Sequence, residues 1–179
     1  MTCIVGMVHN GAVYLGGDSA GSDASTIREM ARPKVFARGE MLIGYTSSFR
    51  FGQILEHVIE MPPRVEGTGH MDYLVSVFAD EVRQTLKDNE EKGGTCLIAY
   101  RGGLYEMQDD FSILPYADAI ATCGSGGEIA LAALTALRRH LPAKTRPVKL
   151  VEMALQVASD LTPYVRPPFT VLSLASPKE

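Results

Sequence analysis

The order of strand and helix patterns along the chain is the sequence feature that most constrains its fold. Short apolar runs with strand periodicity come first, and two segments with one-face helical spacing follow them. The same succession then occurs again and ends on one more strand pattern. The predicted strands are 2–8, 12–16, 34–36, 41–45, 95–100, 104–108, 117–123 and 169–174, and the predicted helices are 49–60, 70–89, 128–140 and 148–161. Because grouped strands and grouped helices pack as separate layers, we expect an α+β fold: a four-layer αββα sandwich of two antiparallel sheets flanked by helix pairs.

A turn signal near the start of the chain predicts which residues meet at one end of the first sheet. Asn10-Gly11 lies between two strand patterns, and this dipeptide favours the left-handed backbone of a two-residue hairpin turn. A hairpin at this point brings the end of the second strand back beside the start of the first. Asp18 is therefore expected close to Thr2.

Length and composition fit one domain over residues 1–179. Apolar residues make up 46% of the chain and charged residues 21%, and we find neither an internal repeat nor an interdomain linker. The formal net charge is −4, and no basic stripe is available to neutralise phosphates, so nucleic acid and membrane surfaces are not expected as partners. No apolar run reaches the ~18 residues of a membrane span, and no signal-peptide pattern is recognised.

The cysteines and histidines indicate a reduced protein without a metal site. Cys3, Cys96 and Cys123 are widely spaced, odd in number and set in apolar runs, which is typical of reduced core residues in a cytoplasmic protein. A thiol nucleophile at Cys3 is the less favoured alternative, because free cysteines are among the most buried residues. The four histidines have no ligand spacing, so neither a metal nor another cofactor is expected.

The start of the chain offers a nucleophile with its own base. If Met1 is removed, Thr2 presents a hydroxyl and a free α-amine on one residue. The ordinary pKa of an α-amine is ~7.7–8.0, so part of it is neutral near pH 7. A nearby Lys34 ammonium would lower that pKa and stabilise developing negative charge, while Asp18 would keep Lys34 protonated and oriented. Taken singly, Asp18 is a turn acid and Lys34 a surface cation; their joint spacing favours one catalytic unit.

Four motifs in order resemble the proteasome β-type subunits. They are Thr2-Cys3-Ile4-Val5-Gly6, Gly16-Gly17-Asp18-Ser19, Lys34-Val35, and Gly124-Ser125-Gly126-Gly127 followed by Ala130-Leu131-Ala132-Ala133. The last segment and the short chain are most similar to the bacterial HslV peptidase and its small proteasome-like relatives in bacteria or phages. This resemblance covers nearly the whole chain and implies the N-terminal nucleophile hydrolase fold, with Thr2, Asp18 and Lys34 at the family's catalytic intervals.

The resemblance also implies supporting residues for the catalytic unit. The oxyanion donor is expected at the backbone N–H of Ser47, where glycine is common in the family. Ser125 matches the serine beside the nucleophile's amine, although it also fits a helix N-cap. Asp160 matches a second acid near the threonine, and a polar residue at a helix end is the alternative. Pro163 replaces the small polar residue that usually follows this acid by three positions.

Substrate contacts are implied by the same alignment. Gly21 and Ser22, together with Ser47, are expected to bind the peptide as an added β-strand. The pocket for the residue before the cleaved bond is expected from Arg32, Phe36, Thr46 and Arg50. The two arginines suggest acidic substrate side chains, but surface salt bridges are the favoured explanation for them.

The expected function is a threonine-type endopeptidase that hydrolyses polypeptides inside a homo-oligomeric ring or double ring. The sequence has no Gly-Lys-Ser/Thr nucleotide-binding loop, so an ATP-dependent unfoldase, if used, is a separate chain. Two alternatives stay open. One is an inactive proteasome-like shell or assembly subunit that retains Met1, and the other is an amidase with the same N-terminal nucleophile acting on a small molecule.

Overall fold

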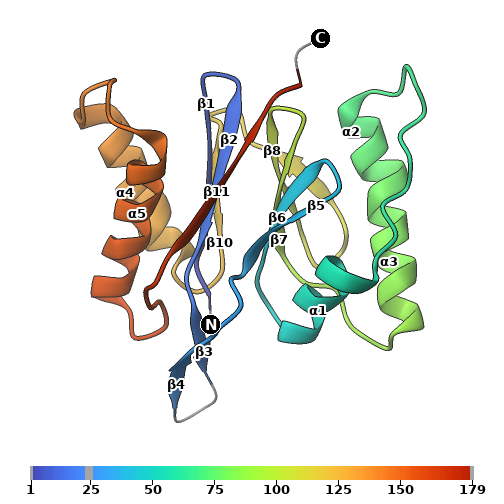
Figure 1. Ribbon diagram of the computed structural model, residues 1–179, viewed down its shortest axis with the longest axis horizontal. Helices are drawn as coiled ribbons and strands as arrows, with labels where there is room; N and C mark the ends of the chain where they lie inside the picture. Colours follow the sequence, from blue (N-terminus) through green and yellow to red (C-terminus); the bar gives the residue numbers. More distant parts are fainter. Residues whose placement is uncertain (1, 23–25, 178–179) are drawn as a thin grey trace.

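A computed structural model describes residues 2–22 and 26–177 of the chain, and its elements form the four layers that the sequence predicts (Figure 1). The strands are β1 (Ile4–His9), β2 (Ala12–Gly17), β3 (Ala20–Ser22), β4 (Ile27–Glu29), β5 (Val35–Arg38), β6 (Met41–Tyr45), β7 (Cys96–Tyr100), β8 (Gly103–Met107), β9 (Ile113–Pro115), β10 (Ile120–Cys123) and β11 (Thr170–Ala175). The helices are α1 (Phe49–Gln53), α2 (His70–Tyr73), α3 (Ala79–Asp88), α4 (Gly127–His140) and α5 (Pro147–Leu161). Two π-helical segments, η1 (Ile54–Val58) and η2 (Leu74–Phe78), continue α1 and join α2 to α3.

The first sheet has the strand order β10-β1-β2-β11, and all of its pairs are antiparallel. The β1–β2 turn is Asn10-Gly11, with φ angles of 49° and 73°, which confirms the predicted hairpin. Its register pairs Ile4 with Gly17, and the N–H of Asp18 donates to the carbonyl of Cys3. The hairpin therefore brings Asp18 to the Thr2 end of β1, as expected.

The second sheet has the order β5-β6-β7-β8-β9, again with antiparallel pairs. The N–H of Tyr45, the last residue of β6, donates to the carbonyl of Lys34 just before β5. The C-terminal end of β6 therefore lies at the same end of its sheet as Lys34. The segment that follows β6, Thr46 to Ser48, leaves the sheet at this point.

Alternating side chains divide the core into three layers. Cys3, Val5 and Met7 pack toward α4 and α5, whereas Ile4 packs between the sheets. The third layer joins the second sheet to α1, α3 and the π-helical segments. Gly44 of β6 allows the two sheets to approach closely, because a Cβ at this position would lie 2.6 Å from Ile4 Cγ2 of β1.

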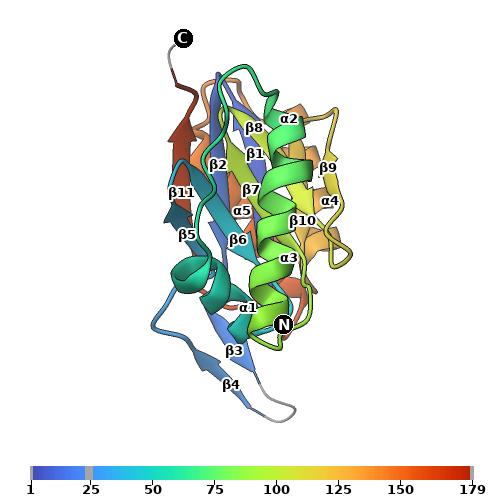
Figure 2. The same ribbon diagram turned by 90° about the vertical axis from the view of Figure 1, so that its right-hand side faces the viewer.

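Several local features differ from the sequence prediction. The β3–β4 ribbon was not predicted, and it projects beyond the ends of the two sheets (Figure 2). Strand β9 was missed, and β10 begins at Ile120 rather than at 117, because Ala119 has a φ of 58° and ends a turn. The β7–β8 turn is Arg101-Gly102, so β8 begins at Gly103 rather than at 104. Among the described residues, no helix is long and apolar enough to cross a membrane.

Candidate active site

Thr2 lies at the end of the sandwich where the β1 and β6 termini meet, and only 6% of its surface is exposed. Its N–H donates to Ser125 Oγ over 3.2 Å, and its carbonyl accepts hydrogen bonds from Ser125 Oγ at 3.3 Å and from Gly126 N at 3.2 Å. The glycine-rich turn before α4 thus fixes the Thr2 peptide unit, and the side chain borders a cavity.

Asp18 and Lys34 form a buried ion pair directly beside Thr2. Each residue is 1% exposed, and Lys34 Nζ donates to Asp18 Oδ1 over 2.9 Å. The same Oδ1 accepts from Cys3 N, and Oδ2 accepts from Ala20 N, both over 2.9 Å. Lys34 is therefore not a solvated surface cation. Its ammonium and the N–H of Cys3, the residue after Thr2, both donate to Asp18 Oδ1.

Burial acts on the titration of Lys34 and Cys3 in this site. Burial lowers the pKa of Lys34 from its ordinary value, and the adjacent Asp18 carboxylate opposes that shift. The Cys3 thiol is fully buried, and burial, followed by the Asp18 charge, raises its pKa to about 12. Because the thiolate is the reactive form of cysteine, Cys3 is a poor nucleophile near neutral pH. Cys3 is a core residue, as expected.

Ser125 does not cap helix α4. The N-cap of α4 is Gly126, and no side chain donates or accepts at that cap. Ser125 instead joins the N–H and the carbonyl of Thr2 through its hydroxyl. The adjacent Gly124 has a φ of 91°, and a Cβ there would lie 2.3 Å from the Thr2 carbonyl oxygen, so glycine is required for this close approach.

On the expectation from the sequence that Thr2 is the nucleophile of a peptidase, Ser125→Ala should lower the rate of peptide hydrolysis by about 10- to 100-fold, because a hydrogen bond to a charged or reacting group contributes ~1.5–3 kcal/mol. Ser125 is exposed, so the unfolding midpoint should change little. Steady-state kinetics with a fluorogenic peptide measure the effect, and Ser76→Ala on η2 serves as the exposed serine control. Equal rates for the two variants would contradict the assigned contact with Thr2.

The segment after β6 carries the expected oxyanion donor. Thr46 N and Thr46 Oγ1 donate to the carbonyl of Thr95 over 2.9 and 3.1 Å, and Thr95 N donates to Ser47 Oγ over 3.3 Å. Ser47 has a φ of 76°, a left-handed conformation that costs a non-glycine residue ~1–2 kcal/mol. A Cβ on Gly94 would lie 2.9 Å from Ser47 Oγ. The serine is therefore held in a backbone conformation that glycine adopts more easily, and its hydroxyl occupies space that Gly94 leaves open.

The cavity beside Thr2 has a volume of about 260 Å³ and an uncharged lining. It is lined by Thr2, Ser22, Tyr45, Thr46, Ser47, Ser48 and Phe49. This lining includes three of the predicted substrate-binding residues, Ser22, Thr46 and Ser47. Hydroxyl groups and two aromatic rings therefore surround the space next to the candidate nucleophile.

Three residues that were expected to line the substrate pocket lie outside this lining. Arg32 contacts Glu56 and His57 at 3.4 and 3.0 Å, and Arg50 donates to Asn89 over 2.8 Å. The ring of Phe36 packs in the core at 6.3 Å from that of Tyr45. Arg32 thus makes the surface salt bridge that was the alternative to a role in binding acidic side chains, whereas Arg50 bonds to the neutral amide of Asn89.

Gly21 and Asp160 are the remaining predicted residues. Gly21 lies in β3 opposite Arg28 of β4, on the ribbon beside the cavity. Asp160 is exposed on the last turn of α5, and its carboxylate accepts from Gln156 Nε2 over 2.6 Å. The buried polar residue of that turn is its neighbour Ser159, which donates to the Val165 carbonyl over 3.1 Å.

Sequence reasoning missed a second support of the site, Ser19. Its hydroxyl donates to the carbonyl of Pro168 over 2.8 Å, and its N–H donates to that of Arg166 over 3.0 Å. These bonds hold the residue after Asp18 against the segment before β11. Its place in the Gly-Gly-Asp-Ser motif was the available signal. Within the described ranges, no group of His, Cys, Asp and Glu side chains is arranged to hold a metal ion.

Comparison with solved structures identifies the fold. No protein-family model matches the sequence. BPH from Thiobacillus denitrificans in complex with epoxomicin superposes with a TM-score of 0.83 at 16% identity, covering 98% of this chain and 100% of that one. HslV from Trypanosoma brucei gives 0.70 at 17% identity, covering 97% and 99%, and Anbu (ancestral beta-subunit) from Yersinia bercovieri gives 0.68 at 11%, covering 98% and 82%. The chain has the fold of these proteasome-like N-terminal nucleophile hydrolases, as the sequence resemblance implied.

Proposed function

We propose that this protein is a threonine-type endopeptidase with Thr2 as its nucleophile, acting once Met1 has been removed. Met1 itself lies outside the described residues. The observation that carries the proposal is the buried Lys34–Asp18 pair, which is bonded to the amide next to Thr2 at the edge of an open cavity. A fold shared with proteasome-like hydrolases supports the same chemistry.

The proposed reaction uses the Thr2 nitrogen as general base. After loss of Met1, the nitrogen that bonds to Ser125 Oγ becomes an α-amine and takes the hydroxyl proton, directly or through one water. Thr2 Oγ then attacks the peptide carbonyl, and the Ser47 N–H stabilises the oxyanion. The proton passes to the leaving amine, which departs and leaves an ester on Thr2. Water, deprotonated by the same α-amine, hydrolyses that ester.

Lys34 and Asp18 keep a positive charge beside this reaction. A buried lysine alone loses its proton easily, but the Asp18 carboxylate at 2.9 Å favours the ammonium form. The ammonium lowers the pKa of the nearby α-amine and stabilises negative charge as it develops on Thr2 Oγ. Asp18 is in turn held by two backbone N–H groups, so the pair has one fixed orientation.

The proposed substrates are polypeptides that bind as an extra strand along β3, with contacts to Gly21, Ser22 and Ser47. The cavity lining favours an uncharged side chain before the cleaved bond, because Arg32 and Arg50 are engaged elsewhere. We further propose a cytoplasmic homo-oligomeric ring or double ring that encloses these sites, with any ATP-dependent unfoldase on a separate chain. These assembly proposals rest on the family resemblance.

The pH dependence of kcat/KM should be bell-shaped. The rate rises with pH as the α-amine, ordinarily of pKa ~7.7–8.0, becomes the neutral base. It falls again when Lys34 loses its proton, and burial sets this limb below the ordinary lysine pKa of 10.5. Lys34→Arg, if active, should move the alkaline limb upward because arginine keeps its charge. A rate that stays constant to pH 10.5 in folded protein would contradict the role of Lys34.

The proposal is tested by comparing a free Thr2 terminus with a blocked one. The chain is produced behind a removable fusion, and peptide hydrolysis is measured before and after the fusion is cut to leave Thr2 first. We expect hydrolysis only after cutting, because the base is then a free amine. Equal activity of both forms would refute an N-terminal base, and inactivity of both forms would favour the shell subunit.

A further inference from the structure

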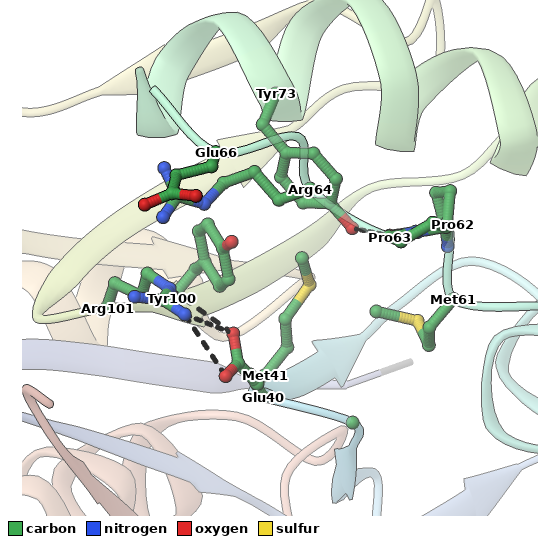
Figure 3. A pocket seen from close by; sticks show the side chains of 11 residues that line it. Glu40, Met41, Met61, Pro62, Pro63, Arg64, Glu66, Tyr73, Tyr100 and Arg101 are labelled. Carbon is green, nitrogen blue, oxygen red and sulfur yellow. Dashed lines mark hydrogen bonds and ion pairs between the residues drawn. The ribbon is translucent and has the colours of Figure 1, made fainter. Parts of the chain in front are cut away.

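Figure 3 shows a second cavity, with a volume of about 430 Å³. It lies at the far end of the second sheet from Thr2. Strand β6 connects the two sites, because Met41 at its start lines this cavity and Tyr45 at its end lines the cavity beside Thr2. The walls are the β5–β6 turn, the β7–β8 turn, the 60–69 loop and α2. The volume is within the range of small-molecule sites, and none of the residues proposed above for catalysis takes part in the lining.

Hydrogen bonds hold the 60–69 loop, which forms one wall of the cavity. Tyr73 donates from its hydroxyl to the carbonyl of Pro62 over 2.6 Å, and Arg38 Nη2 donates to that of Ile59 over 2.5 Å. Arg64 Nη1 donates to the carbonyl of Thr68 within the loop. These bonds preform one side of the cavity.

The interior of the cavity is apolar and aromatic. Met41, Tyr73 and Tyr100 are almost fully buried and form its inner wall, and the two tyrosine rings lie 5.4 Å apart. Met61 closes the side of the cavity opposite the arginines, and Figure 3 shows its thioether together with that of Met41. Flexible thioether and aromatic surfaces of this kind adapt to apolar ligand groups.

The two arginines that line the cavity lie together at its other side (Figure 3). Arg64 is half-buried, and Arg101 has 26% of its side chain exposed and lies over the Tyr100 ring at 5.8 Å. The two acids of the lining reach further into solvent, because Glu66 is exposed and Glu40, which pairs with Arg101 at 2.9 Å, has 65% of its side chain exposed. The charges of the lining are therefore balanced in number, and the two arginines are less exposed than the two glutamates.

We propose that this cavity is a binding site for a carboxylate that carries an adjacent apolar group. The carboxylate binds Arg64 and Arg101, whose planar guanidinium groups suit its two oxygens. It either displaces the exposed Glu40 from Arg101 or shares Arg101 with it. The apolar group packs against Met41, Met61 and Tyr73. A free small acid and the C-terminal residue of a peptide present the same chemistry.

The proposal is tested by calorimetric titration with two probes that represent these sources. Hydrocinnamate represents the free acid and N-acetyl-Ala-Phe the peptide C-terminus, and the carboxamide of each is its uncharged control. We expect at least one acid to bind at least about tenfold more tightly than its amide, because a charge-assisted hydrogen bond is lost in the amide. Binding by only one acid identifies the source.

Variants locate the binding. Arg64→Gln and Arg101→Gln should each lower the binding affinity for the acid by at least about tenfold. Arg83→Gln, which removes an exposed arginine from α3, should leave that affinity unchanged. Thr2→Ala should bind as wild type does, so the result is independent of peptidase activity. Equal affinity for acid and amide, no binding of either acid, or affinity unchanged in both pocket variants would overturn the proposal.

Discussion

Thr2→Ala is expected to lower peptide hydrolysis by at least about 10³-fold, because it removes the attacking oxygen from the residue that also carries the base. The fold should persist, since the Thr2 contacts with Ser125 and Gly126 are made by its backbone. Thr2→Ser should keep measurable activity, because the hydroxyl and the α-amine both remain.

The matched control is Thr46→Ala, which removes a threonine hydroxyl from the same cavity. It should reduce activity far less than Thr2→Ala, because Thr46 donates to the Thr95 carbonyl and takes no part in the reaction. Hydrolysis of a fluorogenic peptide by the variants, with the terminus of each checked by mass, gives the comparison. Wild-type rates in Thr2→Ala would refute Thr2 as the nucleophile.

Lys34→Met is expected to abolish turnover and to lower the free energy of unfolding by about 3–5 kcal/mol. The substitution leaves the buried Asp18 carboxylate with Cys3 N and Ala20 N but without its cation. The double variant Asp18→Asn/Lys34→Met should recover much of the stability, because an amide is cheaper to bury than an unpaired charge, and it should stay inactive.

Lys149→Met on α5 is the control for this series, because it removes an exposed lysine that lies 3.8 Å from Glu152. Its stability should change little, since exposed ion pairs contribute little. Urea unfolding at one protein concentration gives the stabilities, and sedimentation shows whether the variants assemble as wild type does. A Lys34→Met protein as stable as the control would show that the pair does not carry this burial cost, and dispersal to monomers would give Lys34 a structural role.

Local sequence signals predicted the layers and the central pair well. Asn10-Gly11 determines the first hairpin by its backbone preference alone, and that hairpin brings Asp18 to Thr2. Grouped apolar periodicities were sufficient for the first sheet, for four of the five strands of the second sheet, and for all four helical segments, whereas the short strand β9 was missed. Lys34 could be placed at the site because its spacing from Thr2 and Asp18 matches a known family.

Features that depend on tertiary contacts could not be predicted. Strand β4 is short and exposed, so it has no burial pattern to detect. Ser125 is next to a helix start, and only the packed structure shows that its hydroxyl contacts Thr2 instead. Arg32 is engaged by Glu56, a residue on a helical segment far along the chain, which a family alignment does not reveal. The distal cavity likewise combines two turns and a loop that are separated in sequence.

The most direct test of Thr2 as an N-terminal nucleophile is mass spectrometry of the protein after reaction with a peptide that carries a C-terminal electrophile. We predict an intact mass that lacks Met1 and includes one probe, with the adduct mapped to Thr2, and no adduct in Thr2→Ala. Cys3 should stay unmodified, because its buried thiol has a pKa of about 12. Protein that retains Met1 and stays unlabelled, or an adduct on Cys3, would contradict the proposed mechanism.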